Sequence, residues 1–142
     1  MVSTMTIKKL IERSRQYLHN EKNIDLIKKA YYFAEQHHEG QFRKSGDPYI
    51  KHPLEVAYML ADLHTSPATI VAGLLHDLVE DTKVSLQDII DSFGEDIASL
   101  VDGVTKISKL KYMTKEKALA KSHQKILLAM AKDIRVVVIK LV

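Results

Sequence analysis

The sequence predicts an all-α domain, and three kinds of signal support this. Apolar residues recur at helical spacing in two early segments, 6–19 and 23–39. Helix starts are marked by Ser66 followed by Pro67, and by the capping-box pattern from Ser85 to Asp88. The stretch 67–75 is apolar nearly all round, which is typical of a helix in the middle of a domain. We therefore expect a helical bundle around one buried central helix.

Composition restricts the classes of protein to which the chain can belong. Its 142 residues, 46% of them hydrophobic, are enough for one domain with a core. The absence of cysteine excludes disulfides and thiolate metal sites and suits a cytoplasmic protein. No signal peptide and no apolar run long enough for a membrane span are visible. The net charge of +3 fits a polyanionic partner without identifying one.

The central stretch ends in ionisable residues that a buried helix does not normally carry. His76 and Asp77 follow directly on the apolar run, where an unpaired charge is costly. A divalent metal ion would compensate them, because imidazole and carboxylate are both good ligands. On a continuous helix, Glu80 and Asp81 would lie on the same faces one turn further on, where a base that activates water is useful. The alternative is that His76 is a core histidine with satisfied hydrogen bonds, and that Glu80 and Asp81 form a solvated helix end. An isolated His-Asp pair would favour this alternative, but the added Glu-Asp pair favours the metal site.

A loop over 41–51 separates the second and third predicted helices. The second helix is expected to stop at Gly40, and its last-turn histidines at 37 and 38 suit the helix dipole better than a metal role. The ordinary interpretation of Arg43 and Lys44 is a solvated basic loop. Because the loop leads directly to His52, and Tyr49 accompanies them, we expect them to bind phosphates instead.

The third predicted helix carries another candidate ligand. His52 and Pro53 are interpreted as a cap and a first helical position, with the helix spanning 53–63. His52 lies one helix and one turn upstream of His76. Antiparallel packing of the two helices would bring the start of one beside the end of the other, so that His52 could share the metal.

Downstream of the central stretch the sequence predicts further helices. A short helix opens at the Ser85 capping box and stops at Gly94, and another spans 95–105. The segment 106–125 is the most basic; a solvated face is expected, with a lid for a polyphosphate as the weaker alternative. The segment 115–132 is expected to be helical. In 134–142, β-branched residues favour a strand, but a lone strand would have no partner, so we expect a helix.

Several blocks of the sequence resemble one protein family. A His-Asp pair at the end of a buried helix, with a separate upstream His, resembles the HD superfamily of metal-dependent phosphohydrolases. The longer pattern resembles the hydrolase domain of RelA/SpoT homologues. The matching blocks are 40–46 (GQFRKSG), 48–53 (PYIKHP), 76–82 (HDLVEDT), 101–106 (VDGVTK) and 129–136 (AMAKDIRV).

This resemblance implies a fold, an activity and a set of site residues. The fold is an HD-domain helical bundle, and the substrate is (p)ppGpp, the guanosine tetra- and pentaphosphate alarmone of the stringent response. Its 3′-pyrophosphate is removed to give GDP or GTP and pyrophosphate, with Mn²⁺ as the expected cofactor. No membrane or direct nucleic-acid contact is expected. The implied residues are the metal ligands His52, His76 and Asp77, the catalytic Glu80 and Asp81, and the substrate-binding Arg43, Lys44 and Ser45.

The resemblance also implies a continuation beyond Val142 in a longer protein. In the family this segment continues with an Asp-Arg-Leu-His-Asn block, whose Asp is a further metal ligand and whose Asn contacts the nucleotide. We therefore expect 1–142 to be a hydrolase-domain fragment that stops one residue before that ligand and lacks the synthetase and regulatory domains of the long members. Such a fragment should bind metal more weakly and could be inactive. Two alternatives remain open: another HD-type nucleotide phosphohydrolase, and a non-catalytic module that binds alarmone or packs on a partner domain.

Overall fold

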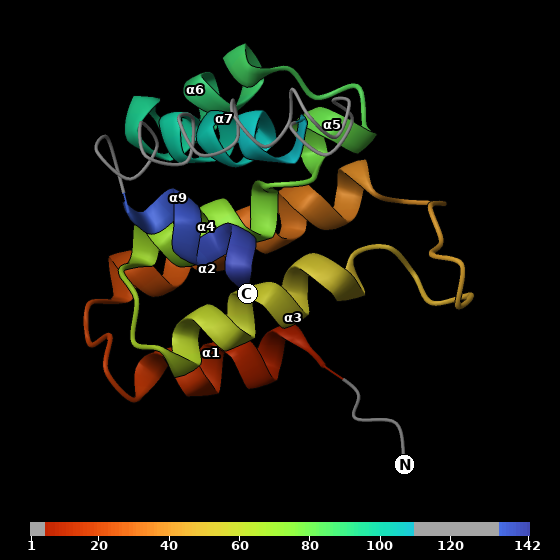
Figure 1. Cartoon of the computed structure of the whole chain (residues 1–142). Coiled ribbons are helices and arrows are strands. Elements are labelled where there is room, and N and C mark those ends of the chain that lie inside the picture. The colour runs from red at the N-terminus through yellow and green to blue at the C-terminus, as the bar shows by residue number, and fades with distance from the viewer. Residues whose placement is uncertain (1–4, 110–133) are drawn as a thin grey trace.

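The computed structural model describes residues 5–109 and 134–142, and within these ranges all regular secondary structure is helical (Figure 1). The one backbone pairing of β type in the described ranges is an isolated bridge between Phe42 and Pro48. The all-α prediction is thus confirmed. The helices are α1 (Ile7–Arg15), α2 (Glu21–His37), α3 (Lys51–Asp62), α4 (Pro67–Leu75), α5 (Leu78–Asp81), α6 (Leu86–Phe93), α7 (Glu95–Lys109) and α9 (Ile134–Leu141).

Helix α4 is the buried centre of the molecule, as the sequence predicts. It begins where expected, because the side chain of Ser66 accepts the backbone N–H of Thr69 and Pro67 occupies the first turn. Every residue from Thr69 to Leu75 is buried. Helices α2, α3, α7 and α9 all contact α4. In Figure 1, α1 and α3 lie below α2 and α4, while α6 and α7 lie above them.

Two glycines allow helices to approach closely. A Cβ placed on Gly73 of α4 would lie 2.6 Å from Cδ1 of Leu60 on α3. A Cβ placed on Gly103 of α7 would lie 2.7 Å from Cγ2 of Val136 on α9. The second contact holds α9 against the body of the domain, with Val136 and Ile139 buried. The terminal segment is therefore a packed helix, and its β-branched residues pack against other helices instead of pairing in a sheet.

The predicted start of α3 is wrong in detail. The helix begins at Lys51, so His52 lies inside its first turn and does not cap it. The residue at the N-cap position, Ile50, makes no side-chain capping bond. None is required for the first amides of α3, because the N–H groups of Lys51 and His52 already donate to the carbonyls of Pro48 and Tyr49.

The helix carrying the central motif is also interrupted, where a continuous helix was expected. Helix α4 ends at Leu75 with His76 as its C-cap, and Asp77 precedes the short helix α5. The His76 ring lies 2.6 Å from the carbonyl of Gly73, which in a continuous helix would accept the N–H of Asp77. The stacking of His76 on Glu80 therefore does not apply. Asp77 and Asp81 keep the helical spacing, because the N–H of Asp81 donates to the carbonyl of Asp77 at 2.9 Å.

The ends of α2 and α6 lie close to the predicted ones, whereas α1 stops at Arg15 instead of residue 19 and α7 continues to Lys109 instead of residue 105. Helix α2 is capped by Asn20, slightly earlier than predicted, and Gly40 follows its end with φ +79°. The capping box of Ser85 and Asp88 opens α6, and Gly94 ends it with φ +94°. The predicted helix at 115–132, and the basic stretch beyond Lys109, lie outside the described residues. Among the helices in the described part of the chain, none has the length and apolar character needed to cross a membrane.

Candidate metal centre

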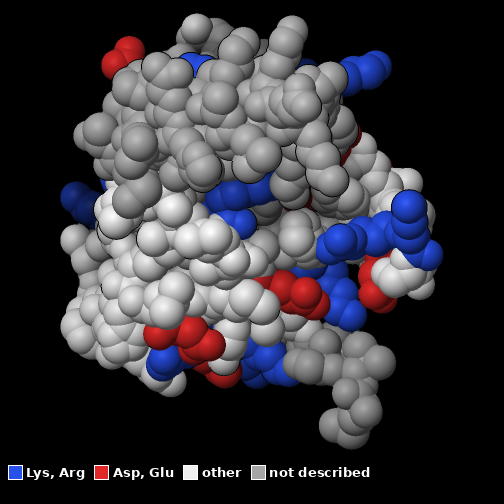
Figure 2. All heavy atoms as spheres, viewed as in Figure 1, with Lys and Arg blue, Asp and Glu red and all other residues white. Residues whose placement is uncertain are grey.

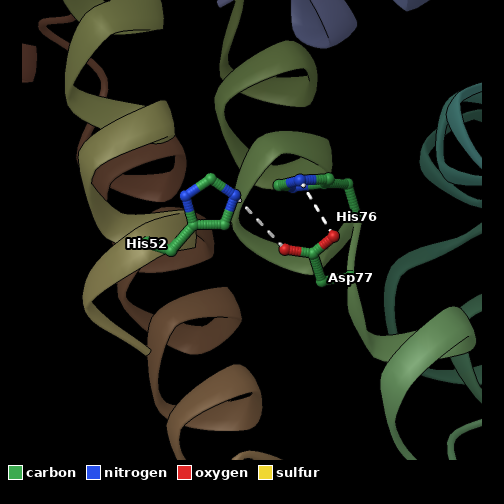
Figure 3. Close-up of side chains that lie close together, drawn as sticks. All are labelled: His52, His76 and Asp77. Atoms are coloured by element: carbon green, nitrogen blue, oxygen red, sulfur yellow. Dashed lines mark ion pairs between the residues drawn. The ribbon is translucent and has the colours of Figure 1, made fainter. Parts of the chain in front are cut away.

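Three predicted ligands come together between α3 and α4. His52 projects from the first turn of α3, while His76 and Asp77 follow the last turn of α4 (Figure 3). One ligand atom from each residue lies within 4.8 Å of the others. The antiparallel packing expected from the sequence produces this arrangement, because the start of α3 lies beside the end of α4.

The His76 ring is oriented by the backbone. Its Nδ1 lies 2.6 Å from the Gly73 carbonyl oxygen, which can only accept, so Nδ1 donates the hydrogen bond. The lone pair of the neutral ring is then on Nε2, which lies 3.2 Å from Oδ1 of Asp77. A hydrogen bond of this type on the far nitrogen is what orients histidines that bind metals. The interruption of the helix at His76 is therefore part of the site.

Asp77 has an unsatisfied oxygen at the centre of the cluster. Its Oδ2 is buried and has no hydrogen-bond partner, although Nε2 of His52 lies 3.6 Å away. A buried carboxylate oxygen without a partner is unfavourable unless a proton or a cation is shared with it. Burial lowers the pKa of His52, although the charge of Asp77 opposes this, and the neutral imidazole is the form that ligates metals. Two imidazoles and one carboxylate therefore fit a divalent cation.

Glu80 and Asp81, the predicted catalytic pair, lie on α5 outside the ligand cluster. Burial raises the pKa of the Glu80 carboxyl, and the charge of Asp77 raises it further, while Lys140 of α9 opposes the shift. The Glu80 side chain still reaches solvent. Asp81 is also exposed, but its Oδ2 accepts a 2.7 Å hydrogen bond from the hydroxyl of Tyr49. The two carboxylates thus have different surroundings.

The predicted substrate loop lies over the cluster. Arg43, Lys44 and Ser45 line a cavity of about 590 Å³ that also reaches His52 and Asp77. Its remaining lining residues are Phe42, Asp47, Tyr49, Lys51 and Glu55. Figure 2 shows Lys and Arg side chains together with Asp and Glu side chains on this side of the molecule, where Figure 1 places the loop. The structure thus brings the predicted substrate-binding residues and two of the three predicted ligands, His52 and Asp77, to one cavity.

Sequence reasoning missed the interactions that join His38, Gln41 and Tyr49, the last of which also lines this cavity. His38 is buried; its ring stacks on Tyr49 at 4.6 Å between centroids, and its Nδ1 lies 2.9 Å from Oε1 of Gln41. The Nε2 of Gln41 donates to the backbone carbonyl of Asp81 at 2.9 Å. The sequence shows only that the loop contains an aromatic residue. It does not reveal the hydrogen bond from Tyr49 to Asp81, because these two residues are 32 positions apart.

Comparisons with known proteins agree with this arrangement. A model of the HD domain family matches residues 30–142, which include all the predicted site residues. A GTP pyrophosphokinase of Myxococcus xanthus is 47% identical over 126 residues, 87% of this chain and 17% of its own length. A GTP pyrophosphokinase of Streptomyces coelicolor is 56% identical over 115 residues, 81% of this chain and 13% of its own.

A third relative belongs to the same group. The GTP pyrophosphokinase rsh of Brucella melitensis is 46% identical over 132 residues, 93% of this chain. The chain spans 18% of the length of that relative. It therefore covers less than a fifth of the length of each of the three relatives, at 17%, 13% and 18%. With the family match and the His-Asp cluster, these similarities establish that the chain belongs to the HD domain family, as an HD domain of the RelA/SpoT type.

Proposed function

We propose that this domain hydrolyses the 3′-pyrophosphate of (p)ppGpp in a reaction that depends on a divalent metal, with Mn²⁺ as the expected ion. The observation that carries the proposal is the buried, unpartnered Oδ2 of Asp77 between two imidazoles, in a cavity that Arg43 and Lys44 also line. A cation bound there would satisfy this oxygen, and Arg43 and Lys44 suit a polyanion, so a phosphorylated substrate bridging the two fits both features.

His52, His76 and Asp77 would hold the ion. The chemistry that such an ion supplies is polarisation of a phosphate oxygen and a lowered pKa for a water molecule bound beside it. Glu80 would accept the proton of the attacking water, since its raised pKa brings it closer to the working range of a general base. Asp81 would orient the same water, and it is held by Tyr49.

The substrate would be bound by the loop. Arg43 and Lys44 would contact phosphates through charge-assisted hydrogen bonds, and the Arg43 guanidinium can also stack on a base. Ser45 would add a hydroxyl in the same cavity. Water then attacks the phosphorus attached to the ribose 3′-oxygen; the bond between these two atoms breaks, and the 3′-oxygen leaves with a proton. The products are pyrophosphate and GDP or GTP.

The names of the relatives describe a different activity. They are called GTP pyrophosphokinases, and this chain matches 13–18% of the length of the Myxococcus, Streptomyces and Brucella proteins. Hydrolysis by this domain is compatible with those names, because the named activity can lie in the remaining parts of the relatives. We further propose that the domain works as part of a longer RelA/SpoT-type chain in the cytoplasm.

The proposal is tested by following pyrophosphate release from guanosine tetraphosphate with Mn²⁺, with Mg²⁺ and with a chelator. The chain is assayed as it stands and extended by the adjoining downstream segment of the Myxococcus xanthus relative. Pyrophosphate release that requires metal and is lost in His76→Ala is the expected result. Orthophosphate release from other nucleotides would instead indicate a different HD-type phosphohydrolase. Tight nucleotide binding without release from either chain would indicate a non-catalytic module.

A further inference from the structure

The loop that carries Arg43 is closed at its base by backbone hydrogen bonds. The N–H of Tyr49 donates to the carbonyl of Gln41 at 2.9 Å, and the N–H of Arg43 donates to the carbonyl of Asp47 at 2.9 Å. The tip at 43–47 is therefore the end of a small hairpin-like loop, and Gln41 and Tyr49 form its two sides at the base. The position of the tip is set by whatever holds these two residues.

Both residues at the base bind one residue of α5. The Tyr49 hydroxyl donates to the Asp81 carboxylate at 2.7 Å, and the Gln41 amide donates to the Asp81 carbonyl at 2.9 Å. Burial, with the hydrogen bond to Asp81, raises the pKa of the Tyr49 hydroxyl, so this group remains a donor. Gln41, Tyr49 and Asp81 thus form a closed triangle of hydrogen bonds.

The buried His38 completes the support. The Asp81 carbonyl can only accept, so the side-chain amide nitrogen of Gln41 must face it. The Oε1 of Gln41 must then face His38. His38 therefore donates from Nδ1 to Gln41, while its ring stacks on Tyr49. One buried imidazole orients both side chains that bind Asp81.

We propose that Asp81 is the anchor of the phosphate-binding loop, and that Tyr49, Gln41 and His38 are positioning residues that act through it. The anchor fixes Arg43, Lys44 and Ser45 relative to α5, which also carries Glu80, and so sets the distance between the phosphate-binding side chains and the proton acceptor. The role in substrate binding rests on the proposed function. The anchoring itself is a property of the free protein.

The test uses Tyr49→Phe, which removes one hydroxyl and keeps the ring on His38. The matched control is Tyr17→Phe: Tyr17 also donates a 2.7 Å hydrogen bond, to the Thr65 carbonyl, and also stacks on a histidine, His64, at 4.4 Å. Thr65 lies beyond the end of α3 and ahead of α4, at the far ends of these helices from His52 and His76. The two variants therefore lose the same chemical group at opposite ends of the domain.

Hydrogen exchange of the nucleotide-free and metal-free protein gives the first readout. In Tyr49→Phe we expect the protection of the 43–49 amides to fall roughly tenfold, because a hydrogen bond to a charged group is lost. Tyr17→Phe should leave these amides as in the wild type. Unchanged protection in Tyr49→Phe, or an equal loss of protection in both variants, would contradict the proposal that Asp81 anchors the loop.

Asp81 variants and a double-mutant cycle give the second readout. Asp81→Asn keeps an acceptor for Tyr49 and should preserve loop protection, whereas Asp81→Ala should reproduce the effect of Tyr49→Phe. Combining Tyr49→Phe with Asp81→Ala should add little to either change, because both remove the same bond. Additive losses, or an Asp81→Asn variant as poorly protected as Asp81→Ala, would contradict the proposal.

Kinetics then separate the anchor from the proposed function. In Tyr49→Phe we expect kcat/KM for pyrophosphate release to fall roughly tenfold, while Tyr17→Phe should leave it unchanged. An unchanged kcat/KM in Tyr49→Phe, or an equal fall in both variants, would refute the positioning role of Tyr49. If the wild type releases no pyrophosphate, the proposed function fails, but the exchange experiments still decide whether Asp81 anchors the loop.

Discussion

Replacing Asp77 with asparagine should separate metal binding from folding. The side chain keeps its shape, but a carboxylate with a buried, unpartnered Oδ2 becomes a neutral amide. Leaving a buried polar atom without a partner costs about 1–3 kcal/mol, and the metal-free wild type carries this cost. We therefore expect metal-free Asp77→Asn to be at least as stable as the metal-free wild type, although most buried substitutions destabilise.

Mn²⁺ should stabilise the wild type more than it stabilises Asp77→Asn. At a free Mn²⁺ concentration of 100 times Kd, binding stabilises the wild type by about 2.7 kcal/mol. For a domain of this size each kcal/mol is worth roughly 3–4 °C in Tm, so Mn²⁺ should raise the Tm of the wild type by about 10 °C. Asp77→Asn should gain almost nothing, because an amide oxygen is a weaker ligand and carries no charge to compensate the ion.

The assay is thermal unfolding followed by circular dichroism with a chelator and with increasing Mn²⁺. It is run at pH 8, where the lowered pKa of His52 leaves this ring neutral. Two results would contradict an unpartnered, metal-binding carboxylate at Asp77. One is a metal-free Asp77→Asn variant several degrees less stable than the wild type, which would mean that the carboxylate is satisfied without metal. The other is an equal Tm increase with Mn²⁺ in both proteins.

Other parts of the structure support three further predictions. Glu80→Gln should keep Mn²⁺ binding but lower kcat by roughly 10²–10⁴. The raised pKa of Glu80 places the acid limb of the pH–rate profile above the ordinary glutamate range, so that limb should disappear in this variant. Loss of Mn²⁺ binding in Glu80→Gln would show that Glu80 is a ligand instead. Arg43→Ala should weaken guanosine tetraphosphate binding tenfold or more, by about 1.5–3 kcal/mol, without changing Tm, as isothermal titration and unfolding would show. Gly103→Ala should destabilise the domain by about 1–3 kcal/mol in denaturant unfolding, because its Cβ would lie 2.7 Å from stiff, β-branched Val136, and the added Val136→Ala should restore part of the loss.

Local signals explain which elements the sequence predicts correctly. The starts of α4 and α6 depend on side chains that bond to backbone within three residues, namely Ser66 and the Ser85–Asp88 pair. Apolar burial along α4 follows in the same way from its composition. The proximity of His52 to His76 and Asp77 was predictable too, because it requires only that two antiparallel helices place His52 near His76.

Tertiary contacts explain the errors. The break between α4 and α5 arises because the His76 ring competes for the Gly73 carbonyl, which residue spacing alone does not reveal. The start of α3 is displaced because turn bonds to the Pro48 and Tyr49 carbonyls replace a side-chain cap. The hydrogen bond between Tyr49 and Asp81 joins residues that no short-range pattern connects.

The most direct test is to count the Mn²⁺ ions bound by the chain, because the proposed hydrolysis depends on a cation between His52, His76 and Asp77. Electron paramagnetic resonance measures free Mn²⁺ during a titration and so gives the number bound. We expect one ion per wild-type chain, lost in His76→Ala and in Asp77→Asn but kept in Glu80→Gln. Binding that is absent from the wild type, or that survives in His76→Ala and Asp77→Asn, would contradict the proposed metal site.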